Sequence, residues 1–115
     1  MKRSLFPIST LFILFSAVYA QHFVPAYLAF SDNPYLAMNI TVTSAQLDNI
    51  DLEAGDEIGI FDGDVCVGSG MLEGTISSID FPDNLLAMVA SAQDGDTPGF
   101  SAGNPISYHY WDASA

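Results

Sequence analysis

Short apolar stretches that alternate at every second residue constrain the fold of this chain more than any other feature. In MNITVT, residues 38–43, the apolar side chains Met38, Ile40 and Val42 share one side of an extended strand, and polar side chains share the other. This alternation is typical of a half-buried β-strand. By the same reasoning, further strands are expected at residues 57–61, 65–72, 85–92 and 106–111.

Clusters of Gly, Pro, Asn and Asp separate these stretches and indicate turns. Asp62-Gly63 predicts a hairpin closed by a type I′ turn, with Ile60 and Val65 close to it. The stretch 85–92 is apolar on both faces, as expected of an inner strand. No stretch after residue 20 has a sustained helical period. The sequence therefore predicts an all-β fold, a small antiparallel β-sandwich of the immunoglobulin-like or jelly-roll-like kind.

Residues 1–20 have the layout of a secretory signal peptide. Lys2 and Arg3 precede an apolar run, which ends in Val18-Tyr19-Ala20, the small-residue pattern of a cleavage site. The alternative, a membrane anchor, needs about 20 apolar residues, whereas this run is shorter and contains Pro7. We expect a secreted or cell-surface protein that starts at Gln21 and has no membrane span after cleavage.

Cleavage would leave a strongly acidic chain. The chain has one Lys and one Arg, Lys2 and Arg3, and both leave with the signal peptide. All 14 Asp and Glu residues stay, so residues 21–115 carry a formal charge of −14. Nucleic-acid binding is excluded, because it depends on Lys and Arg at the phosphates. Binding to anionic lipid is excluded for the same reason. Such a surface attracts cations instead.

The length after the leader suits one small domain, residues 21–115. The single cysteine, Cys66, excludes an internal disulfide. Because Cys66 stands between Val65 and Val67, we expect it to be a buried small residue and not a reactive thiol.

Two segments, LEAGDEIGIFDGDVCVGSG and NLLAMVASAQDGDTPGFSAGNPISYHYWDAS, resemble a recurrent module of secreted, multidomain proteins from Bacteroidetes-type bacteria. Those proteins often carry a type IX secretion sorting tail. The resemblance implies a β-sandwich without assigned catalysis, in which further strands follow the WDAS segment. This chain stops at Ala115, so either it is a fragment or the domain ends early. We expect a sandwich that lacks its last strand or strands and exposes an unpaired edge.

Acidic residues near the turns are candidates for a calcium site. Calcium takes six to eight oxygen ligands, mostly carboxylates and carbonyls. The candidate ligands come from the two Asp-Gly-Asp triplets: Asp62, Asp64, Asp94 and Asp96. Neither triplet continues into the full pattern of an EF-hand loop, and so acidic a chain contains close acid pairs by composition alone. The alternative is that the triplets are only turns.

Catalysis finds little support in the sequence. Ser107, His109 and Asp112 occupy one predicted strand segment, where they cannot converge as a catalytic triad requires. No feature selects a carboxylate pair for glycoside hydrolysis. We therefore expect a protein that is not an enzyme.

Sugar binding is the alternative function. Trp111 and His109 share one face of the last predicted strand, and exposed aromatic side chains bind glycans, although Trp111 could instead cover the core at the rim. The sequence thus predicts an extracellular module with a structural or adhesion role that contacts neighbouring domains of a surface protein. The alternative is a carbohydrate-binding module that contacts glycans and is stabilised by calcium.

Overall fold

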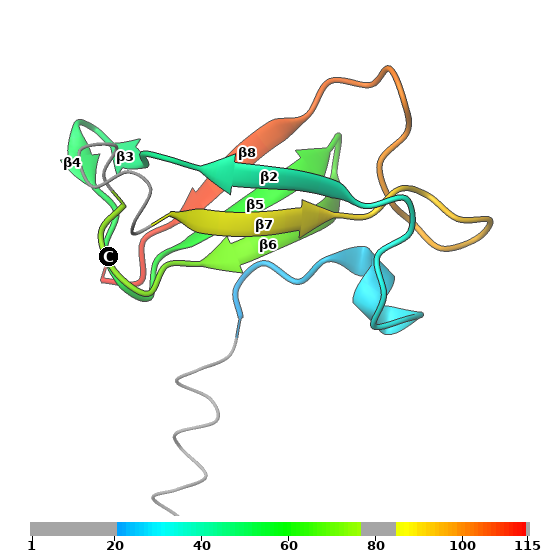
Figure 1. Cartoon of the computed structure of the whole chain (residues 1–115), viewed down its shortest axis with the longest axis horizontal. Helices are drawn as coiled ribbons and strands as arrows, with labels where there is room; N and C mark the ends of the chain where they lie inside the picture. The colour runs from blue at the N-terminus through cyan, green and yellow to red at the C-terminus, as the bar shows by residue number, and fades with distance from the viewer. Residues whose placement is uncertain (1–20, 77–84, 115) are drawn as a thin grey trace, which may run out of the picture.

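The computed structural model describes residues 21–76 and 85–114 (Figure 1). Its main feature is a five-stranded antiparallel sheet in the order β2-β7-β6-β5-β8, and a two-stranded sheet, β3-β4, lies at one end of it. The predicted all-β antiparallel fold is confirmed. The elements are η1 (Ala26–Ala29), β2 (Met38–Val42), β3 (Gln46–Leu47), β4 (Ile50–Asp51), β5 (Glu57–Asp62), β6 (Val65–Met71), β7 (Leu86–Ala90) and β8 (Ser107–Trp111).

The strand register confirms the alternation read from residues 38–43. Met38, Ile40 and Val42 lie opposite Ala90, Met88 and Leu86 of β7. These three side chains of β2 pack against the buried core, whereas the residues between them are exposed. Strand β7 lies between β2 and β6, so the prediction of an inner strand is also confirmed.

The core lies on one face of the large sheet. Ile58 and Ile60 of β5 and Met88 of β7 are at most 2% exposed. Gly68 and Gly70 of β6 make room for this packing, since a Cβ on Gly68 would lie 2.4 Å from the carbonyl oxygen of Val89. The strands β5, β6 and β7 therefore pack through large side chains that lie over glycines. The core residues are Ala45, Leu52, Ile58, Ile60, Val67, Leu72, Ile76, Met88 and Ala90.

The hairpin between β5 and β6 forms as predicted, but its turn differs in detail. Asp62 pairs with Val65, so the two turn residues are Gly63 and Asp64, one position later than expected. Positive φ occurs at Gly63 (62°) and not at Asp64, which is the pattern of a type II′ turn. The predicted type I′ turn is therefore wrong here, because Asp62 remains in the strand. A β-bulge follows, and Ile60 lies opposite Gly68.

The type I′ geometry occurs instead in the smaller sheet. Asp48 and Asn49 connect β3 to β4, and both have positive φ, 55° and 67°. The second Asp-Gly-Asp triplet repeats the first, because Asp94 and Thr97 exchange two backbone hydrogen bonds around Gly95, whose φ is 58°. Both triplets thus form tight two-residue turns.

The segment that precedes β2 runs beside β6 and includes the short helix η1 (Figure 1). Further along, the backbone N–H of Tyr35 donates to Ser91 Oγ over 2.9 Å, and the N–H of Ala92 donates to the Tyr35 carbonyl over 2.8 Å. Ser91 is buried. Among the residues described, no helix is both long and apolar enough to cross a membrane.

Strand β8 is one edge of the large sheet. It pairs with β5, and in the described part of the chain no strand pairs with its other side. All five of its residues are exposed. The register places Tyr108 and Tyr110 opposite Ile60 and Ile58, so they share the core side of the sheet.

Candidate functional site

The candidate site is a cluster of five aromatic rings on the face of the sheet opposite the core. We call it the aromatic cluster: His22, Phe23, Phe61, His109 and Trp111. Two pairs are stacked. The rings of His22 and Trp111 lie 3.7 Å apart with 8° between their planes, and those of Phe61 and His109 lie 4.0 Å apart at 15°.

Phe23 joins the two stacks. Its ring meets His22 edge to face at 4.8 Å and 78°, and it meets Phe61 at 5.8 Å and 81°. Edge-to-face contacts of this kind are favourable, because the positive edge of one ring meets the negative face of the other. The rings thus form one connected surface and not two separate pairs.

Gly59 provides the space that Phe23 occupies. A Cβ at residue 59 would lie 2.8 Å from Cγ of Phe23 and 2.8 Å from Cε1 of Phe61. Any larger residue would have to displace one of these rings. Gly59 lies opposite His109 in the register, so the space that Phe23 occupies is in the middle of the aromatic cluster.

Glu57 holds the chain that carries His22 and Phe23. Its side chain is 2% exposed. The backbone N–H of His22 donates to both carboxylate oxygens, over 3.0 Å to Oε1 and 2.8 Å to Oε2, and the N–H of Phe23 donates to Oε1 over 3.0 Å. Glu57 lies opposite Trp111, so this anchor is next to the His22–Trp111 stack.

A second buried acid fixes the end of β8. Asp56 is 5% exposed, and its carboxylate accepts hydrogen bonds from the backbone N–H of Glu53 (2.8 Å) and of Ala113 (2.9 Å). Asp56 therefore joins the turn before β5 to the residues that follow Trp111. Beside it, the hydroxyl and backbone N–H of Ser114 donate to Asp112 and lower the pKa of that exposed carboxyl.

The cluster faces solvent at β8. His109 is exposed, and Trp111 is 41% exposed on the face opposite Ile58 and Ile60. The structure therefore brings together the two residues predicted to bind a ligand, and it places Trp111 away from the buried core. Residues 97–111 contain no acidic residue of their own, although the carboxylate of Asp62 lies against the loop before β8.

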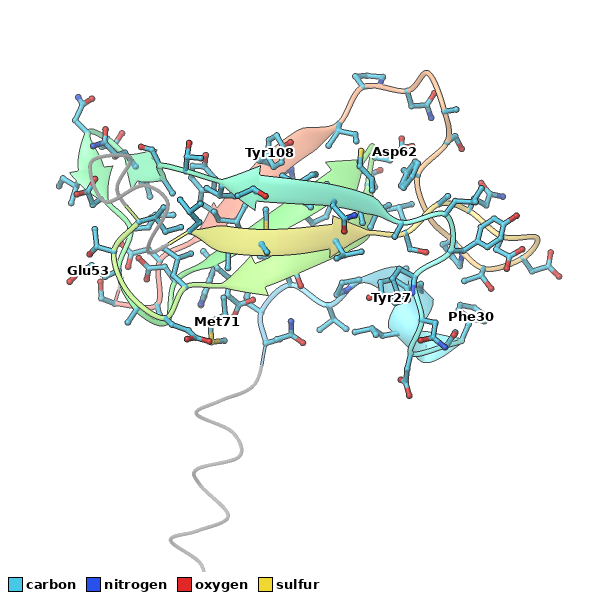
Figure 2. All side chains as sticks on the ribbon, viewed as in Figure 1. Tyr27, Phe30, Glu53, Asp62, Met71 and Tyr108 are labelled. Carbon is cyan, nitrogen blue, oxygen red and sulfur yellow. The ribbon has the colours of Figure 1, made fainter. Side chains whose placement is uncertain are left out.

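The described part of the structure does not bring together the four aspartates predicted to bind calcium. Asp62 accepts hydrogen bonds from the Ser101 N–H (2.8 Å) and from Nδ2 of Asn104, and so ties the loop before β8 to β5 (Figure 2). Asp64, Asp94 and Asp96 lie in the two tight turns. Within residues 21–76 and 85–114, no three His, Cys, Asp or Glu side chains are grouped closely enough to hold a metal ion.

Several contributors to the site escaped the sequence analysis. Glu57, Gly59 and Phe61 alternate along β5 on the side opposite Ile58 and Ile60, which was a readable signal for a second, polar and aromatic face. His22 and Phe23 had no such signal, because they come from a segment without a strand pattern. Cys66, expected to be buried, is partly buried, and this burial raises the pKa of its thiol.

Comparison with known proteins returned no similarity: no family model, no curated protein and no solved structure matches the chain.

Proposed function

We propose that this chain is an exported, non-enzymatic adhesion module that binds neutral carbohydrate on the aromatic cluster. The observation that carries the proposal is the joint exposure of His109 and Trp111 on one face of β8. Sugar rings stack on flat aromatic surfaces through their C–H groups, and a ligand held this way needs no cleft. The stacked and braced rings form a preorganised surface, which lowers the entropy cost of binding.

The charge of the protein supports a neutral ligand. Fourteen acids and no Lys or Arg after residue 20 repel anionic polysaccharides over the range set by the Debye length, about 8–10 Å in physiological salt. Strand β8 carries no acidic side chain, so a neutral glycan on His109 and Trp111 would not have to desolvate a carboxylate of that strand. Hydroxyl groups of the sugar would find hydrogen-bond partners in His22 and His109.

The test is binding of the exported chain to neutral and anionic polysaccharides, measured by affinity electrophoresis and by tryptophan fluorescence. Trp111 is the single tryptophan of the chain, so its emission reports on the site directly. We expect retardation by at least one neutral polysaccharide and a loss of about two- to tenfold in affinity for Trp111→Ala, since stacking on one aromatic side chain is worth about 0.5–1.5 kcal/mol.

Phe30→Ala is the matched control, because Phe30 is a 60% exposed aromatic residue that lies far from Tyr108 of β8 (Figure 2). This variant should bind as the wild type does. Equal losses for both variants, or no binding to any neutral polysaccharide, would contradict the proposal. In that case the exposed edge of β8 would be better explained by pairing with a strand of a neighbouring domain.

A further inference from the structure

We propose that the open edge of β8 pairs with the same edge of a second copy of this chain, so that two sheets join across a two-fold axis at His109. The inference is independent of carbohydrate binding. In the described part of the chain only β5 pairs with β8, so backbone N–H and C=O groups along the other edge of β8 have no strand partner there. Such an edge is a template for another strand.

The first argument is that β8 lacks the features that protect an edge strand. Natural proteins protect exposed edges with charged side chains, prolines or bulges. The strand Ser107–Trp111 contains no Lys, Asp, Glu or Pro, and its register with β5 is continuous over all five residues. All five are exposed. The edge is therefore suited to pairing.

The second argument comes from a comparison with β2, the opposite edge of the sheet. The apolar side chains of β2 pack against the buried core. On the same side of the sheet, Tyr108 and Tyr110 of β8 are 49% and 42% exposed. Their rings thus keep apolar surface that a further strand beside β8 would cover.

The third argument is the order of residues in β8, which identifies the occupant as a second copy. The strand has a tyrosine on each side of His109. In an antiparallel pair centred on His109, Tyr108 lies opposite Tyr110 of the second copy, and aromatic pairs are favourable cross-strand neighbours. On the other face, Trp111 lies opposite the small side chain of Ser107 of the second copy. The strand is complementary to itself, as a two-fold interface requires.

The fourth argument is charge. The chain has a net charge of −12, so two copies repel each other over most of their surface. Strand β8 has no acidic side chain. Asp112, which follows it, would lie opposite Ile106 of the second copy in this register. Two copies can therefore meet at β8 without placing one carboxylate directly opposite another.

Pairing of this kind uses backbone groups and leaves both faces of the sheet open. Because the two-fold axis is perpendicular to the sheet, the aromatic clusters of both copies lie on the same face of the joined sheet. This would double the surface proposed to bind carbohydrate, a consequence that rests on the proposed function. An interface of one strand pair is small, so we expect a weak dimer that depends on concentration.

The test is disulfide cross-linking of the full chain in a mild detergent, which keeps the apolar run of residues 5–20 from associating. Cys66→Ala first removes the single cysteine. In this background, His109→Cys places a thiol at the two-fold axis, where paired Cα atoms are about 4.5–5.5 Å apart, a separation that a disulfide spans. Ser107→Cys is the matched control, since its two copies would be about 13 Å apart, at about 3.3 Å per residue.

We expect the His109→Cys variant to form disulfide-linked dimers at least tenfold faster than the Ser107→Cys variant. The rate should rise with protein concentration. It should also rise with added sodium chloride, because salt screens the repulsion between the two acidic chains.

A second test changes the charge of the edge and needs no new cysteine. Tyr108→Glu/Tyr110→Glu places carboxylates opposite carboxylates, so we expect an at least tenfold loss of dimer in native mass spectrometry. Tyr108→Lys/Tyr110→Glu places Lys opposite Glu in both pairs and should keep the dimer. Leu28→Glu/Phe30→Glu is the matched control: both residues are exposed and belong to the segment beside β6, so the same added charge should leave the dimer intact.

Equal cross-linking rates for the two cysteine variants would overturn the inference, because association elsewhere on the chain does not distinguish positions 107 and 109. So would a chain that stays monomeric at every concentration, as expected if a strand of a neighbouring domain occupied the edge instead. Monomers that bind a neutral polysaccharide would overturn this inference only. A dimer that binds none would overturn the proposed function only, so the two failures can be told apart.

Discussion

The two faces of strand β5 are stabilised by different interactions. On one face Ile58 and Ile60 are almost fully buried and pack over glycines of β6. On the other face, the Glu57 carboxylate holds backbone N–H groups, and Phe61 stacks on His109. The same six-residue strand therefore supports a core through shape and apolar burial, and a candidate binding surface through hydrogen bonds and ring stacking.

This difference separates stability from function. Burial of apolar surface is non-directional, so the core face tolerates changes that conserve volume. The aromatic face depends on direction, because Glu57 must meet two particular N–H groups and Phe23 must fit over Gly59. Mutations of the core face should therefore unfold the protein, whereas mutations of the aromatic face should remove the proposed carbohydrate binding at a smaller cost in stability.

The largest effect is expected for Ile60→Ala. Ile60 is fully buried, so removal of three side-chain carbons leaves a cavity and lowers the free energy of unfolding by about 3 kcal/mol. Urea denaturation measures the change. Leu47→Ala, at a 40% exposed site in β3, is the control and should cost less than about 1 kcal/mol. Similar losses for both variants would mean that the core is not where the structure places it.

Two glycines allow the faces to be compared directly. In Gly68→Ala, the new Cβ meets the Val89 carbonyl oxygen at 2.4 Å, and backbone cannot move aside cheaply. We expect a loss of about 2–3 kcal/mol in unfolding free energy. In Gly59→Ala, the Cβ meets the rings of Phe23 and Phe61, which can shift, so the loss should be smaller, about 1 kcal/mol.

The readouts of the two glycine variants should differ as well. Gly59→Ala should change Trp111 emission in the folded protein, because it displaces Phe23 from its position beside the His22–Trp111 stack. Gly68→Ala should leave the emission of the remaining folded protein unchanged. If Gly59→Ala is the more destabilising variant and is spectroscopically silent, the assignment of packing to one face and recognition to the other is wrong.

Sequence reasoning was successful where one periodicity dominates. Alternation identified the apolar side of β2 and the two sides of β8, since each depends only on which residues are two apart. A run that is apolar on both faces identified the inner position of β7. It was less accurate at the turn after β5. There Asp62 forms long-range hydrogen bonds to Ser101 and Asn104, and such tertiary contacts are invisible to local turn rules.

The candidate site was predictable only in part. His109 and Trp111 were found, because they share a strand face. Glu57 and Phe23 were missed, because their roles depend on a contact between residues more than 30 positions apart, which no local pattern encodes. The grouping of acids near the turns suggested a metal site, but in a chain this acidic such groupings arise without a ligand.

The charge of the molecule allows a test of the calcium hypothesis. A chain with 14 acids repels itself, so added salt should raise its melting temperature by a few degrees through screening. We expect calcium chloride and sodium chloride at equal ionic strength to give the same shift, because the aspartates Asp62, Asp64, Asp94 and Asp96 do not converge in the described residues. A larger shift with calcium, reversed by a chelator, would show a specific site.

The smallest effect concerns Cys66, which lies opposite Phe61 beside the β-bulge. Burial raises the pKa of its thiol from the ordinary value of 9.0, so the folded protein holds this proton more tightly than the unfolded chain does. The resulting stabilisation is present below the pKa of the unfolded thiol and is lost as the pH rises through the pKa of the folded one. Cys66→Ala removes the titrating group. The difference in unfolding free energy between wild type and Cys66→Ala should therefore change between pH 8 and pH 11, to the disadvantage of the wild type.

Alkylation by iodoacetamide gives a second measure, because it requires the thiolate. It should be slower in the folded protein than in urea at every pH of this range. Faster alkylation in the folded state would contradict the raised pKa and would mean that Cys66 is an activated thiol.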